Sequence, residues 1–117
     1  MTDTKKMALL PIGMADILPP DATFEADTLN KLMATFSSNG YERIKPPLIE
    51  FEDGLLSGLG TAMSTQTFRL MDPISQRMMG VRTDMTPQVA RIAATRLKKT
   101  ARPLRLSYSG DVLRVKG

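Results

Sequence analysis

The chain has 117 residues, a net charge of +4 and a pI of about 9.7, and 42% of its residues are hydrophobic. This length allows at most one domain, and the absence of cysteine and histidine excludes disulfides and thiolate metal sites and removes the usual general base. No segment approaches the roughly 20 apolar residues of a membrane-spanning helix, so we expect a cytoplasmic protein without membrane contact.

The positive charge has two interpretations. A basic chain can bind nucleic acid, but a more ordinary explanation is a solvated basic face. The basic residues between Arg91 and Lys116 are distributed over a predicted helix and a predicted strand, and aromatic residues are not interleaved with them as a stacking platform requires. We therefore favour the solvated face, do not expect a nucleic-acid partner, and keep a nucleic-acid-binding module as the weaker alternative.

The first part of the chain predicts a flexible N-terminus at residues 1–10 and a helix at about 21–39. Pro19-Pro20 cannot lie inside a helix, and Asp21 after it is a suitable N-cap. Gly40 can end the helix in the left-handed conformation. The apolar residues of this helix fall on one stripe, which consists of Phe24, Leu29, Leu32, Met33 and Phe36.

The stretch "YERIKPPLIEF" after this helix is expected to be extended. Its Pro46-Pro47 pair belongs at a sheet edge, a bulge or an interface, because proline cannot donate to a sheet ladder. The glycine-punctuated residues 54–66 predict a short helix followed by a loop. Two strands at 67–72 and 77–84, around the turn Asp72–Ser75, then predict a β-hairpin.

The segment "TPQVARIAATRLKKT", residues 86–100, is the most regular predicted helix. Thr86 suits the N-cap, Pro87 the first helical position and Lys98-Lys99 the last turn. A final strand begins near Leu104, and because nothing follows to pair with it, we expect unpaired backbone groups along it. This order of elements indicates an α+β fold with an antiparallel sheet and flanking helices. The predicted buried stripe of the helix consists of Val89, Ile92, Ala93 and Leu97.

The segment "VRTDMTPQ" places charged side chains where a strand gives way to a helix. Arg82 and Asp84 share a face of an extended strand, and Thr86 follows at the helix start. The group could hold a zwitterion, with Asp84 on an ammonium group and Arg82 or backbone N–H groups on an anion. In the alternative, Arg82 pairs with Asp84 and Thr86 only caps the helix. Arg114 is likewise either a clamp for phosphate or carboxylate or part of an exposed basic face.

Four segments resemble, in order and spacing, the catalytic core of class II histidyl-tRNA synthetases: "GMADILPPD", "GYERIKPPLIE", "VRTDMTPQVARIA" and "YSGDVLRVKG". The second resembles motif 1, a helix and strand at the dimer interface, with Pro47 at the signature proline. The fourth resembles the first strand of motif 2, with Arg114 at the arginine that contacts ATP. Residues 11–117 are then expected to be the N-terminal part of a synthetase-like domain that stops within motif 2.

Two differences point to one branch of this family. The synthetases read arginine-proline-glutamate-glycine-threonine where this sequence has "RTDMT" from Arg82 to Thr86, and Lys116 replaces the glutamate that helps to recognise adenine. The stretch "RTDMTPQVARIA" instead resembles the paralogues that serve as regulatory subunits of the short form of ATP phosphoribosyltransferase. This resemblance implies a non-catalytic subunit, required for activity and histidine feedback in the first step of histidine biosynthesis. An authentic histidyl-tRNA synthetase, which aminoacylates tRNA, is the alternative.

The resemblance also implies roles for individual residues. Asp84 would accept the α-ammonium group of a bound histidine, Thr86 and Arg114 would lie in the same pocket, and Arg82 would support it. The implied partners are a catalytic subunit of ATP phosphoribosyltransferase, a second copy of the chain, and histidine as an allosteric effector. No cofactor, metal or catalytic residue is expected. The dimer interface would include Gly40, Tyr41, Pro47 and Glu50.

Overall fold

The computed structural model describes residues 9–56 and 61–115, and its contacts divide the chain into two compact units, Met1–Thr35 and Phe36–Gly117. The predicted flexible N-terminus falls almost entirely outside the described residues, and so does Lys116. None of the helices in the described part of the chain has the length and apolar character needed to cross a membrane.

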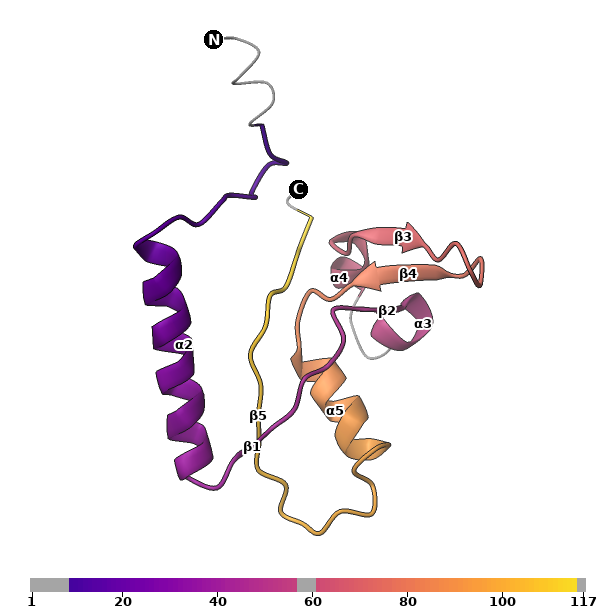
Figure 1. Ribbon diagram of the computed structural model, residues 1–117. Helices are drawn as coiled ribbons and strands as arrows, with labels where there is room; N and C mark the ends of the chain where they lie inside the picture. The colour runs from indigo at the N-terminus through magenta and orange to yellow at the C-terminus, as the bar shows by residue number, and fades with distance from the viewer. Residues whose placement is uncertain (1–8, 57–60, 116–117) are drawn as a thin grey trace. The chain divides into compact units, whose positions relative to one another are not determined.

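Helix α2, Asp21–Ser38, leads from the first unit into the second (Figure 1). It confirms the helix predicted at 21–39, although Asp21 is its first helical residue rather than its N-cap. Met33 is the buried residue of the predicted apolar stripe. The other members of the stripe remain exposed, namely Phe24, Leu29, Leu32 and Phe36.

The C-terminal end of α2 is closed by a Schellman-type cap. Gly40 has a φ of 84°, the left-handed conformation that glycine adopts without steric cost, which confirms its predicted role. The Tyr41 N–H donates to the Phe36 carbonyl at 3.0 Å, and the two rings meet edge to face with centroids 6.0 Å apart. The turn therefore fixes where the chain leaves the helix.

The second unit contains a three-stranded antiparallel sheet in the order β2-β4-β3. Strands β3, Arg69–Met71, and β4, Met78–Val81, form the predicted hairpin. Its turn is held by the Asp72 carboxylate, which accepts hydrogen bonds from the Ile74 N–H and the Ser75 hydroxyl. The hairpin prediction is therefore confirmed.

Strand β2, Ile49–Phe51, pairs with β4 and continues directly into the short helix α3, Glu52–Leu55. A further short helix, α4, covers Thr61–Thr65, and the intervening residues 57–60 lie outside the described part of the chain. Figure 1 shows both short helices beside the sheet. A short helix was predicted in this region, and the structure contains one on each side of the gap.

The second sheet joins β1, Glu42–Arg43, to β5, Leu106–Ser107, and the two strands are parallel. The antiparallel prediction is therefore correct for the three-stranded sheet and wrong for this pair. The expectation of an unpaired final strand is also wrong: beyond β5, the backbone N–H of Val115 donates to the Gln66 carbonyl at 2.7 Å. Pairing between segments far apart in sequence accounts for both corrections.

Helix α5, Thr86–Ala94, is shorter than the predicted 86–100. Met85 occupies the N-cap position instead of Thr86, and Lys98-Lys99 lie in turns beyond the helix. The Arg102 guanidinium donates to the carbonyls of Ala93, Leu97 and Thr100, so it connects the last turn of α5 to the turns that follow it.

The interior of the second unit is largely polar. Leu55 and Met85 are its buried hydrophobic residues among those described. The predicted stripe of α5 is only half-buried, and the fully enclosed residue of that helix is Gln88, at 2% exposure. Hydrogen bonds from buried side chains therefore position much of this unit. The other buried polar residues are Thr67, Arg82, Thr83 and Ser107.

Candidate functional site

The candidate site lies where β4 leads into α5 and the C-terminal segment runs alongside. The Leu113 N–H donates to the Arg82 carbonyl at 3.0 Å, and Arg114 Nε donates to the Thr83 carbonyl at 3.2 Å. These two bonds bring the C-terminal segment to the start of α5. The structure therefore places Arg114 near Asp84.

Asp84 folds back onto the start of α5. Its Oδ1 accepts a hydrogen bond from the Thr86 backbone N–H at 3.0 Å. This bond is the main reason that the pKa of Asp84 lies below its usual value, and the positive charge of Arg114 adds a smaller effect in the same direction. The carboxylate is exposed and ionised at neutral pH, so it can accept a hydrogen bond from an ammonium group.

Thr86 is exposed at the start of the helix, and its hydroxyl lies 3.4 Å from the phenolic oxygen of Tyr108. Tyr108 was not predicted as a site residue, although it begins the segment "YSGDVLRVKG" that carries part of the family resemblance. It lines a cavity of about 300 Å³ together with Phe36, Tyr41, Leu106 and Ser107. The charged groups are therefore next to a partly aromatic hollow.

Arg82 does not bind Asp84. Its guanidinium is buried and donates from Nε to the Asp111 carbonyl at 2.8 Å and from Nη1 to the Pro46 carbonyl at 3.0 Å. The alternative in which Arg82 simply pairs with Asp84 is therefore not what the structure shows. Arg82 instead connects the backbone of the motif 1 region to that of the C-terminal segment, which leaves Arg114 as the exposed cation beside Asp84.

The proposed dimer residues occupy two different places. Gly40 and Tyr41 form the turn after α2, whereas Pro47 and Glu50 contact the buried Gln88. Gln88 Nε2 donates to the Pro47 carbonyl at 2.6 Å and to Glu50 Oε2 at 3.0 Å. Their part in a dimer interface remains a prediction, and their contacts within the chain link β2 to α5.

An ion pair extends this network. Glu50 Oε1 lies 2.8 Å from Arg91 Nη2, one turn along α5 from Gln88. Two buried atoms of the network, Gln88 Oε1 and Arg91 Nε, have no hydrogen-bond partner among the described residues. Sequence reasoning missed this network, because a glutamine within a helical stripe carries no periodic signal.

The described residues include no group of three or more carboxylate, histidine or cysteine side chains placed to hold a metal ion. The site offers instead an anionic group, a cationic group and a hydroxyl. Such a set can bind the ammonium and carboxylate groups of an amino acid, with the adjoining hollow available to a side chain.

The fold of this chain is similar to part of a crystal structure of an ATP phosphoribosyltransferase regulatory subunit/histidyl-tRNA synthetase from Bacillus halodurans, with a TM-score of 0.80 and 30% identity. The match covers 95% of this chain and 29% of that chain. The architecture is therefore part of a class II synthetase-like catalytic core, with helices and an antiparallel sheet, as expected.

The chain belongs to the histidyl-tRNA synthetase family, whose model matches residues 13–117. It is 68% identical over 120 residues to an ATP phosphoribosyltransferase regulatory subunit from Rhodospirillum centenum. It is 65% identical over 117 residues to a protein of the same description from Paramagnetospirillum magneticum. Both matches cover all of this chain and 31% of the relative, so the chain spans about a third of the length of the curated relatives it matches.

Proposed function

We propose that this sequence belongs to a non-catalytic regulatory subunit of ATP phosphoribosyltransferase. The subunit is required for activity and for histidine feedback in the first step of histidine biosynthesis. The observation that carries the proposal is the 64–68% identity to three proteins described as such regulatory subunits, over 97–100% of this chain. The open site at the start of α5, with its charges suited to an amino acid, supports the same function.

In this proposal histidine binds at Asp84, Thr86 and Arg114. The α-ammonium group contacts the Asp84 carboxylate, and Arg114 provides the positive charge for the α-carboxylate. Arg82 is a positioning residue, because its buried guanidinium holds the segment from which Arg114 projects. The site is exposed in the described part of the chain, so segments elsewhere in the protein would complete its walls.

Feedback requires two states that bind histidine with different affinity and are coupled to the catalytic subunit. Helix α5 is suited to that coupling. Its N-terminal end carries the proposed ligand residues, and its first turns bind β2 through Gln88 and Arg91. The partners are a catalytic subunit and a second copy of the chain, and the proposed compartment is the cytoplasm.

The alternative is an authentic histidyl-tRNA synthetase. The family model favours it, since that model is described by the synthetase activity. The Asp84-Met85 pair, in place of glutamate-glycine, counts against it, as does Lys116 at the position where a carboxylate would recognise adenine. Lys116 lies outside the described residues, so this argument rests on sequence.

One pair of assays separates the two functions. The protein that carries this sequence is mixed with its catalytic subunit, and phosphoribosyl transfer to ATP is measured with and without histidine. We expect activity to depend on the added subunit and to be inhibited by histidine. In parallel, we expect no histidine-dependent exchange between ATP and pyrophosphate. Exchange at a synthetase-like rate, without activation of the catalytic subunit, would contradict the proposal.

A further inference from the structure

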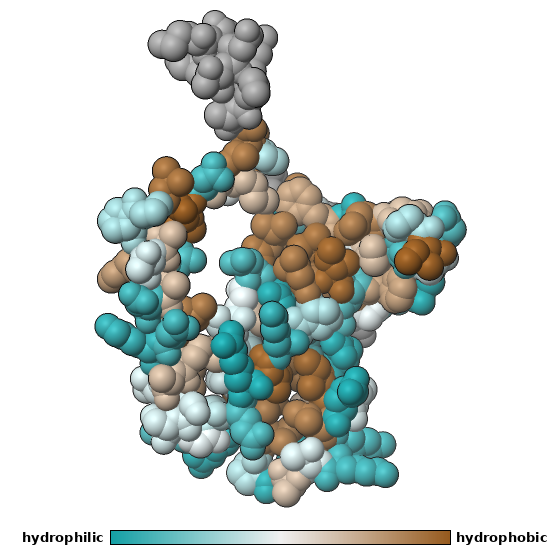
Figure 2. Space-filling model, viewed as in Figure 1, coloured by the Kyte–Doolittle hydropathy of each residue, from teal (hydrophilic) through white to brown (hydrophobic). Residues whose placement is uncertain are grey.

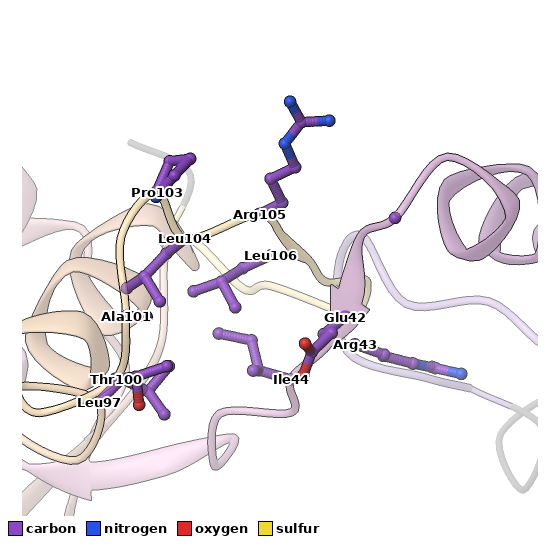
Figure 3. A pocket seen from close by; sticks show the side chains of 11 residues that line it. Glu42, Arg43, Ile44, Leu97, Thr100, Ala101, Pro103, Leu104, Arg105 and Leu106 are labelled. Atoms are coloured by element: carbon purple, nitrogen blue, oxygen red, sulfur yellow. The ribbon is translucent and has the colours of Figure 1, made fainter.

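A second cavity lies away from the proposed histidine site. It has a volume of about 200 Å³ and is enclosed by β1, β5 and the segment that connects α5 to β5. Figure 3 shows apolar side chains from these three places converging on one space. All four of the following are half-buried: Ile44, Leu97, Leu104 and Leu106.

The positive charge of the chain is concentrated in the two segments that supply the cavity lining, although Arg43 and Arg105 are the basic residues that line the cavity itself, beside the acidic Glu42. Residues 40–46 and 95–106, the two segments that line it, contain seven basic residues and one acidic residue, a net charge of +6. The whole chain carries +4, so the remaining residues together carry −2. The basic residues are Arg43, Lys45, Arg96, Lys98, Lys99, Arg102 and Arg105.

These basic side chains are not neutralised within the described part of the chain. Its three ion pairs are Arg69 with Glu52, Arg77 with Asp53 and Arg91 with Glu50, and none of them involves the two lining segments. Figure 2 shows hydrophobic atoms between α5 and β5, with hydrophilic side chains around them. The surface is therefore an apolar depression with Arg43 and Arg105 at its edge and further basic residues in the adjoining sequence, and an apolar group next to acidic ones would complement it.

The wall of the cavity is held in shape before any partner binds. Arg102 turns back and donates to three carbonyls of the connecting segment and the end of α5, at 2.8–3.3 Å. On the opposite wall, the Glu42 N–H donates to the Arg105 carbonyl at 2.8 Å. A partner would thus meet a preformed depression, which lowers the entropic cost of association.

The size of the cavity distinguishes between classes of partner. Pockets for small molecules are usually about 300–1,000 Å³, so a volume of about 200 Å³ suits an inserted side chain better. Proteins that bind single-stranded nucleic acid commonly stack the bases on aromatic side chains, and the lining residues include none. Protein partners commonly place an apolar anchor in such a pocket, with charged groups at the rim.

We propose that this cavity is the docking site of the catalytic subunit, which inserts an apolar side chain from an acidic segment of its surface. The proposal rests on the proposed function and names the surface through which it is exerted. The docking site is distinct from the histidine site, because none of Asp84, Thr86 and Arg114 lines the cavity, and it shares only Gly40 with the residues predicted for the dimer interface. Histidine binding and subunit docking should therefore be separable by mutation.

Two variants test the apolar and basic features independently. Ala101 is exposed and lines the cavity, so Ala101→Trp can block the depression with a side chain that has room at the surface. Arg105→Glu reverses one charge of the rim. Lys31→Glu, on the exposed surface of α2, is the matched control for charge. Binding of the purified catalytic subunit is measured by calorimetry at low and high salt, with histidine binding measured on every variant.

We expect Ala101→Trp and Arg105→Glu each to weaken binding of the catalytic subunit by about tenfold at low salt, with unchanged histidine affinity. The loss from Arg105→Glu should shrink at high salt, and Lys31→Glu should bind normally. If the unaltered protein does not bind the catalytic subunit, the proposed function itself fails. If it binds and both cavity variants bind equally well, the docking site is wrong. Binding of bulk tRNA, measured in the same way, tests the nucleic-acid alternative. The inference is also overturned if Arg105→Glu abolishes binding of bulk tRNA but leaves the catalytic subunit bound.

Discussion

The buried guanidinium of Arg82 lies directly against Gly110. A β-carbon on residue 110 would overlap Arg82 Nη2 and would lie 3.4 Å from the sulfur of Met85. The guanidinium has little freedom to move away, because it donates to the carbonyls of Asp111 and Pro46. Arg82 as a whole is only 6% exposed. A glycine at this position therefore allows backbone to enclose a buried positive charge.

The first prediction concerns this contact. Gly110→Ala should lower the free energy of unfolding by about 1–3 kcal/mol, because the new methyl group displaces a side chain that is fixed by hydrogen bonds. Urea denaturation measures the change. Gly54→Ala is the control, since a β-carbon at residue 54 meets nothing within 4 Å and alanine is a better helix former. Equal stability of the two variants would show that Arg82 can move aside freely.

Local elements of this fold were predictable because single residues define them. Pro19-Pro20 and Gly40 delimit α2, and the turn after Asp72 defines the hairpin. The parallel pairing of β1 with β5 was not predictable in the same way. This pairing depends on the path of the chain between the strands, and the sequence of neither strand indicates which strand it pairs with.

The candidate site was only partly predictable. Asp84 and Thr86 are close in sequence, but the position of Arg114 depends on hydrogen bonds to Arg82 and Thr83, and only the family resemblance indicated it. Gln88 was missed because periodicity arguments follow apolar side chains, and this buried side chain is polar. The concentration of basic residues was also misjudged, since five of them fall between the early end of α5 and the start of β5.

The second prediction concerns the link between β2 and α5. A double-mutant cycle with Glu50→Gln and Arg91→Gln should give a coupling energy of about 1–2 kcal/mol, because the Glu50 side chain is only 14% exposed and the two atoms are 2.8 Å apart. The matched cycle uses Asp53→Asn and Arg77→Gln, an exposed pair 3.7 Å apart, and should give less than about 0.5 kcal/mol. Similar values for the two cycles would contradict a structural role for the Glu50 network.

The third prediction concerns dimerisation. The exposed stripe of α2 includes Phe24, at 72% exposure, and Leu32, at 52%. Side chains of this size are usually covered by a partner when they form a continuous patch. Phe24→Glu should therefore shift the sedimentation profile from dimer to monomer without unfolding the protein. Ala34→Glu adds the same charge to another exposed position of α2 and should remain dimeric. A monomer at high concentration for the unaltered protein would rule out this interface.

The fourth prediction separates the two roles of Asp84, as an acceptor for the Thr86 N–H and as a charge for histidine. The hydrogen bond keeps the pKa of Asp84 below its usual value of 3.8. The contribution of this group to stability is thus complete above that value and is lost as the pH falls through its lower folded pKa. At pH 7, Asp84→Asn retains an oxygen that can accept the Thr86 N–H but removes the charge.

We therefore expect Asp84→Asn to leave the melting temperature at pH 7 nearly unchanged. Histidine binding should weaken about tenfold, because a hydrogen bond to a charged partner contributes roughly 1.5–3 kcal/mol, whereas a neutral one contributes about 1 kcal/mol. Feedback inhibition of the assembled phosphoribosyltransferase should shift to higher histidine concentration by a similar factor. Asp84→Ala should lower the melting temperature as well, since it removes the acceptor at the start of α5. Calorimetric titration with histidine, together with a melting curve for each variant, distinguishes the two effects. A well-folded Asp84→Asn protein with unchanged histidine affinity would place the ammonium group of the ligand elsewhere.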